Sequence, residues 1–195
     1  MSTKQALAGF IIIIIIILGA VFFIFREDIT ERIGGKKVAD VGVVKKLDLS
    51  YPSGWQEERR TKADVIVGIL SKANRENPDA TLIIRSITGK LEESVNVKTL
   101  TDQVADSLSK EIENFEGLVS KKAIKIKSFD AVEVRYKQKS SRDDITYEVL
   151  QIIIPTQNQT FFLTFRSPEA DFNAAQGDVE KIVDDFGSYL KSLRQ

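Results

Sequence analysis

The longest uninterrupted hydrophobic stretch of the sequence covers residues 6–25, which contain no charged side chain and include seven isoleucines in a row. A helix rises about 1.5 Å per residue, so a stretch of this length matches a hydrocarbon core of roughly 30 Å. It is longer than the apolar core of a secretory signal, and its best small pair, Gly19 and Ala20, lies inside it. We therefore expect an uncleaved N-terminal transmembrane helix within residues 1–25. A cleaved signal peptide and a pilin-type stalk are the alternatives.

Residues 26–42 predict a juxtamembrane helix followed by a linker. Ile29 and Ile33 are four residues apart, which places them on one face of a helix. Gly34 and Gly35 are typical of a helix end, because glycine readily adopts the left-handed backbone found there. Residues 43–195 then have the length and composition of one globular domain.

Two periodicities distinguish strands from helices within residues 43–195. Apolar residues alternate with polar ones in half-buried strands and recur every three or four residues in helices that lie on a sheet. The pattern predicts strands near residues 47–51, 63–69, 80–87, 124–126, 132–136, 145–154 and 160–165, and helices near residues 99–115 and 172–193. The strands at 145–154 and 160–165 are apolar on both faces, which indicates a central position. We expect the hairpin before them to turn near residues 128–130 and to have one solvated face.

Several segments of this pattern resemble the PsbP-like family, named for the extrinsic lumenal protein of photosystem II. They are the Tyr-Pro-Ser-Gly-Trp turn at 51–55, the helix with Leu100, Val104 and Leu108, the hairpin segment 128–136, and the strand 161–165 leading into 179–186. The resemblance covers residues 43–193. It implies an α+β fold, an α/β/α sandwich with a central antiparallel sheet, and a non-enzymatic, extracytoplasmic domain. The metal-binding histidines of plant members have no counterpart here, so no ligand residue can be carried over.

The composition excludes several kinds of chemistry. Lys4 is the only charged residue before Arg26, so the remainder carries 27 basic and 28 acidic side chains, and a near-neutral domain is an unlikely partner for nucleic acid. The sequence has no cysteine and no histidine. This excludes thiol nucleophiles, disulfides, the Ser-His-Asp triad and the usual zinc shells, and it leaves no cysteine for a lipoprotein anchor. We expect no cofactor.

Two adjacent acidic pairs, Asp143 with Asp144 and Asp184 with Asp185, are candidates for cation binding. Calcium generally requires six to eight oxygen ligands from a loop with spaced acids and a glycine, and neither pair lies in such a loop. We interpret both pairs as solvated surface charge. A pair of carboxylates could also catalyse hydrolysis, but no motif selects a pair.

The middle hairpin has a basic outer face that is the main candidate surface. It comprises Lys125, Lys127, Arg135 and Lys137, with further lysines nearby. Each basic residue near an anionic membrane is attracted by about 1 kcal/mol. Contact with lipid headgroups or with an acidic protein is therefore one interpretation. The other is that lysines on an edge strand prevent aggregation.

These observations predict a membrane-anchored, non-catalytic binding or assembly module. Its expected partners are the lipid bilayer, through residues 6–25, and either a protein of a membrane complex or anionic headgroups. The alternatives are a membrane-bound hydrolase that uses carboxylates and a structural stalk or filament subunit. The cluster of Arg26, Arg32, Lys36 and Lys37 favours a cytoplasmic domain. The family resemblance favours the extracytoplasmic side, and we expect that side.

Overall fold

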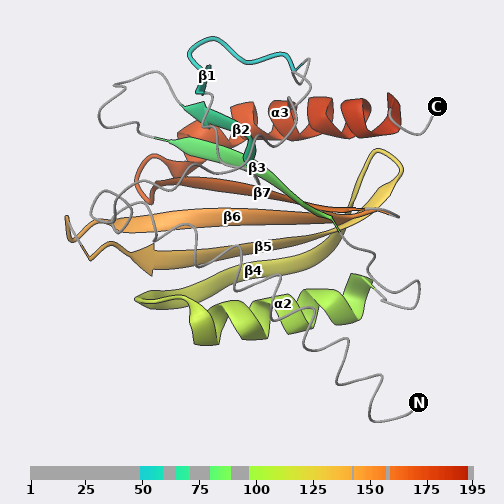
Figure 1. Cartoon of the computed structure of the whole chain (residues 1–195). Coiled ribbons are helices and arrows are strands. Elements are labelled where there is room, and N and C mark those ends of the chain that lie inside the picture. The colour runs from blue at the N-terminus through green and yellow to red at the C-terminus, as the bar shows by residue number, and fades with distance from the viewer. Residues whose placement is uncertain are drawn as a thin grey trace, which may run out of the picture.

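A seven-stranded antiparallel sheet forms the middle layer of the protein in a computed structural model (Figure 1). The structure describes residues 49–58, 65–70, 80–88, 97–141, 143–156 and 159–192. The sheet has the order β1-β2-β3-β7-β6-β5-β4, and all neighbouring strands are antiparallel. The elements are β1 (Gln56–Glu58), β2 (Val65–Leu70), β3 (Thr81–Thr88), α2 (Val97–Glu111), β4 (Phe115–Ile126), β5 (Phe129–Lys139), β6 (Thr146–Pro155), β7 (Gln159–Pro168) and α3 (Phe172–Ser192). This composition confirms the predicted α+β class.

The expected membrane anchor over residues 1–25 and the juxtamembrane helix and linker over 26–42 lie outside the described residues. Among the residues that are described, no helix is both long enough and apolar enough to cross a bilayer.

The side chains of the sheet alternate between two hydrophobic cores, one on each face. On β5, Ala131 belongs to the core under α3, whereas Val132 and Val134 belong to the core under α2. On β7, Phe161 and Phe162 divide in the same way. The two helices therefore cover opposite faces of the sheet, which is the α/β/α arrangement that the PsbP-like resemblance implies (Figure 1).

The two strands that are apolar on both faces lie in the middle of the sheet, as predicted. β6 and β7 are adjacent and are flanked by β5 and β3. Seven consecutive residues of β6, 148–154, are buried. A helix covers each face of the sheet, so these strands do not need alternating polar residues.

The strand predicted at 47–51 is not observed in its described part, residues 49–51. Leu49 and Tyr51 instead pack into the core under α3, and the backbone N–H of Ser50 donates to Asp185 at 3.2 Å. The alternation arises because this extended segment binds α3 and not a neighbouring strand. Trp55, which follows the Tyr-Pro-Ser-Gly turn, is buried in the core under α3, with its ring centroid 6.4 Å from that of Phe165.

The helix predicted to reach Phe115 ends at Glu111, so that prediction is wrong at its C-terminus. Phe115 opens β4, yet it still packs against the α2 core, with its ring centroid 5.9 Å from that of Tyr136. The apolar spacing continues because both elements contribute to one core. Asn114, with φ 56°, reverses the chain between them.

One turn also differs from the sequence prediction. The β4–β5 hairpin turns at Lys127 and Ser128, with Ile126 paired to Phe129, and not over residues 128–130. Lys127 has φ 54°, the left-handed conformation that two-residue hairpin turns require. Further along the chain, Pro168 is the last residue of β7, and α3 begins at Phe172.

Candidate binding groove

A groove of about 310 Å³ lies between α3 and the face of the sheet formed by β4, β5 and β6. α3 packs mainly on β7, and the groove opens toward the other side of the helix. Its apolar lining comes from Leu150 and Ile152 of the sheet and from Val179 and Val183 of α3. These side chains are buried members of the α3 core, so the groove is an incompletely filled edge of that core.

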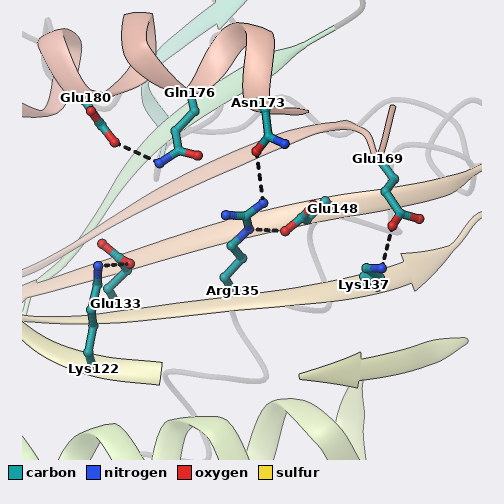
Figure 2. Close-up of polar contacts among 9 residues, drawn as sticks. All are labelled: Lys122, Glu133, Arg135, Lys137, Glu148, Glu169, Asn173, Gln176 and Glu180. Atoms are coloured by element: carbon teal, nitrogen blue, oxygen red, sulfur yellow. Dashed lines mark hydrogen bonds and ion pairs between the residues drawn. The ribbon is translucent and has the colours of Figure 1, made fainter. Parts of the chain in front are cut away.

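Polar pairs form the rim of this groove (Figure 2). Lys122 and Glu133 are directly opposite each other on β4 and β5, and their charged atoms are 3.0 Å apart. Across the groove on α3, Nε2 of Gln176 donates to Oε1 of Glu180 at 2.8 Å. The rim therefore presents both hydrogen-bond donors and acceptors above an apolar floor.

One ion pair ties the sheet edge to α3. Nζ of Lys127, in the β4–β5 turn, is 2.5 Å from Oδ2 of Asp184. Both residues line the groove, and the pair joins its two walls at this end.

Arg135 occupies the other end of the groove and is held from three sides. Its Nε donates to Glu148, whose side chain is only 5% exposed. Its Nη2 donates to Oδ1 of Asn173 at 3.4 Å, and its guanidinium lies 4.2 Å from the ring centroid of Phe172 (Figure 2). These contacts fix the plane of the guanidinium and leave the side chain 23% exposed.

The four predicted basic residues do not share one face of the hairpin, although Lys125, Lys127 and Arg135 all line the groove. Arg135 and Lys137 lie on the α3 side of β5, whereas Lys125 pairs with Asp130 on the α2 side, and Lys127 lies in the turn. The two-residue turn causes this separation, because it pairs odd-numbered residues of β4 with even-numbered residues of β5. The turn predicted over 128–130 would have placed the odd-numbered residues of both strands on one face.

Each of these basic side chains also has an acidic partner. The ion pairs are Lys125 with Asp130, Lys127 with Asp184, Arg135 with Glu148, and Lys137 with Glu169. The hydrogen bond to Glu169 raises the pKa of Lys137. On α2, Asp102 likewise binds Lys121 at 2.9 Å and raises the pKa of this lysine. The basic hairpin thus attracts acids from both helices, a structural role that the sequence pattern did not indicate.

The adjacent acidic pairs are divided between different partners. Asp184 binds Lys127, whereas Asp185 accepts from the backbone N–H of Ser50. Asp144 binds Lys139 at 2.7 Å. Asp143 accepts hydrogen bonds from Ser140 and Tyr147, and these hold its pKa below the ordinary value. No group of three or more potential metal ligands occurs within the described part of the chain.

The fold is shared with two solved structures. Cyanobacterial PsbP (CyanoP) from Synechocystis sp. PCC 6803 is 11% identical, with a TM-score of 0.51 over 77% of this chain and 96% of that chain. LpqN from Mycobacterium tuberculosis, described as involved in cell envelope biogenesis, is 16% identical, with a TM-score of 0.53 over 70% of this chain and 79% of that chain. These similarities confirm the predicted PsbP-like fold.

Residues 31–187 match the Lpp-LpqN family, described as "Probable lipoprotein LpqN". Because the match covers most of the sequence, the chain belongs to this family. No curated protein sequence matches it.

Proposed function

We propose that this protein is a non-catalytic, envelope-associated binding module that takes a small ligand in the groove between α3 and β4–β6. The groove itself carries the proposal. Its volume of about 310 Å³ is at the lower end of the range for small-molecule sites, roughly 300–1,000 Å³. An apolar floor with a few polar groups at the rim is the usual composition of such sites. A ligand with one apolar and one polar part suits this arrangement.

The proposed location at the envelope rests on the family. Its description as a lipoprotein family, and the role of LpqN in cell envelope biogenesis, support a domain held at a membrane outside the cytoplasm. A bacterial lipoprotein carries its lipid on a cysteine, and none of the 195 residues is a cysteine. The apolar residues 6–25 would therefore anchor the domain in place of a lipid. Such an anchor raises the effective concentration of the domain near ligands in the membrane.

Extraction and protease accessibility test the proposed location. Membranes from cells that produce the full chain would be washed with alkaline carbonate, and intact cells with a permeabilised outer layer would be treated with protease. We expect the protein to stay in the membrane pellet and its domain to be cleaved from outside. Release by carbonate, a mature N-terminus after Phe25, or full protection from protease would contradict the proposal.

Methyl NMR of the full chain in phosphatidylcholine nanodiscs tests the groove. Titration with octanol should shift the methyl signals of Leu150 and Ile152 in a saturable manner. Val183→Trp would fill the groove and should abolish the shifts. Val119→Trp, at an exposed position on the β4 edge, should leave them unchanged. Equal effects of the two substitutions, or shifts confined to other methyl groups, would show that the groove is not the binding site.

A further inference from the structure

We infer that the Arg135 end of the groove is an anion site, and that the ligand is an amphiphile with a carboxylate or phosphate headgroup. This inference rests on the proposed function, because it names the chemical class of ligand for the same groove. It also replaces the broad basic face expected from the sequence with one arginine and its neighbours.

The guanidinium of Arg135 is prepared for an anion. Its Nε donates to Glu148 and its Nη2 donates to Asn173, while the ring of Phe172 lies against the face of the guanidinium. In the described part of the chain, Nη1 has no hydrogen-bond partner, and Arg135 lines the groove with part of its side chain exposed. An oriented guanidinium with a free N–H edge matches the geometry of carboxylate and phosphate oxygens. Because Glu148 is buried behind the arginine, it orients this group without contacting the ligand.

Two further donors lie beside Arg135 on β4. Ser120 is the cross-strand neighbour of Arg135 and lines the groove, and within the described residues its hydroxyl makes no hydrogen bond. Lys122 is two residues further along the same strand and also lines the groove. Its pairing with Glu133 leaves the lysine side chain 59% exposed, and exposed ion pairs are weak enough to rearrange. The guanidinium of Arg135, the hydroxyl of Ser120 and the ammonium of Lys122 thus line one part of the groove, together with the carboxylate of Glu133 that pairs with the lysine.

The apolar floor begins directly next to this end. Leu150 is the cross-strand neighbour of Arg135 on β6, and Ile152 is that of Glu133. An alkyl chain that starts at Arg135 would pass over Leu150 and Ile152 toward Val183. At the opposite end of the groove Asp184 pairs with Lys127, and on α3 the carboxylate of Glu180 accepts a hydrogen bond from Gln176. The headgroup is placed at Arg135 because Nη1 has no partner within the described residues, whereas Lys125 and Lys127 pair with Asp130 and Asp184.

The test compares headgroups on eight-carbon probes. It uses the full-length protein in phosphatidylcholine nanodiscs and the methyl signals of Leu150 and Ile152 as readout. The probes are octanoate, octyl phosphate and octanol, with acetate and inorganic phosphate as headgroups that lack a chain. One charge-assisted hydrogen bond corresponds to about a tenfold gain in affinity or more. We expect at least this preference for octanoate or octyl phosphate over octanol, and the tighter of the two identifies the headgroup.

Paired substitutions assign the preference to Arg135. The double variant Arg135→Gln/Glu148→Gln removes the pair without leaving a buried acid alone, and should lose the preference while still binding octanol. The control Lys137→Gln/Glu169→Gln removes a neighbouring pair that does not line the groove, and should keep the preference. If the double variant does not fold, Ser120→Ala and Lys122→Met take its place. Each should weaken the binding of octanoate or octyl phosphate more than the binding of octanol.

The outcomes separate this inference from the proposed function. Equal binding of octanol and both anionic probes would overturn the anion site and leave the groove as a binding site. Equal binding of acetate and octanoate, or of inorganic phosphate and octyl phosphate, would overturn the inference that the ligand is an amphiphile. Loss of the preference in the control variant would show a general charge effect and also overturn the inference. Failure of every probe to shift Leu150 and Ile152 would contradict both the inference and the proposed function.

Discussion

Gly187 lies where α3 passes over the β4–β5 turn, and a methyl group added there would collide with the sheet. A Cβ atom at this position would be 2.6 Å from Cγ2 of Ile126 and 3.1 Å from Cγ of Lys127. Ile126 is 5% exposed and β-branched, so its methyl group has little freedom to move. The side chain of Lys127 is held by its ion pair with Asp184 of the same helix. Substitution by alanine therefore requires α3 to move away from the sheet.

Gly177 is a matched control in the same helix, because a Cβ atom there would have no neighbour within 4 Å. Gly177→Ala should stabilise the protein by about 0.5–1 kcal/mol through helix propensity alone. Overpacking typically costs about 1–3 kcal/mol. Gly187→Ala gains the same propensity, so we expect a net loss of up to about 2 kcal/mol. The two variants should therefore differ by about 1–3 kcal/mol.

Urea unfolding of the full chain in detergent micelles would measure this difference. The fluorescence of Trp55 is a suitable signal, because it is the only tryptophan and is buried in the α3 core. Ile126→Ala removes the methyl group that collides, so the double variant with Gly187→Ala should lose less stability than the sum of the single losses. Equal stabilisation by both glycine substitutions would refute the close approach of α3 to the turn.

Three further predictions concern the β4–β5 hairpin and use the same assay. Arg135→Met should lower the free energy of unfolding by about 2 kcal/mol, because it leaves the buried carboxylate of Glu148 unpaired. Adding Glu148→Gln should recover most of this loss. If the double variant were no more stable than Arg135→Met, Arg135 and Glu148 would not form a buried pair. Burial raises the pKa of the Tyr136 hydroxyl in the folded protein. The folded state is therefore fully stable below about pH 10 and loses stability at higher pH, because Tyr136 ionises first in the unfolded chain. Tyr136→Phe should therefore reduce the loss of stability above pH 10, and an unchanged pH profile would argue against this. Lys125→Gln should leave the unfolding midpoint unchanged, because Lys125 and Asp130 are 72% and 60% exposed, and a marked decrease would show that the pair is structural.

Arg135 illustrates the limit of sequence reasoning about the site. Arg135 alternates with Val134 and Tyr136, so the sequence correctly predicts that it lies on the other face of β5 from these two residues. The same pattern, however, predicts that this face is exposed to solvent. In the structure, α3 covers part of it, and Arg135 packs on Phe172. Phe172 is 37 positions away in the chain, and no local pattern connects the two residues. Glu148 and Asn173 were missed for the same reason, although a single acid within the apolar strand 145–154 is a detectable signal.

The identity and type of most elements are local properties, and the sequence alone determined them. Alternation, apolar runs on both faces and three-to-four spacing are sufficient for the α+β class, for the central place of β6 and β7, and for the long stripe of α3. Strand pairing is different, because a change of one residue in a turn moves every side chain of a strand to the other face. The β4–β5 register, the acidic partners of the basic residues and the groove beside α3 all depend on such long-range contacts. Only the tertiary structure could decide them.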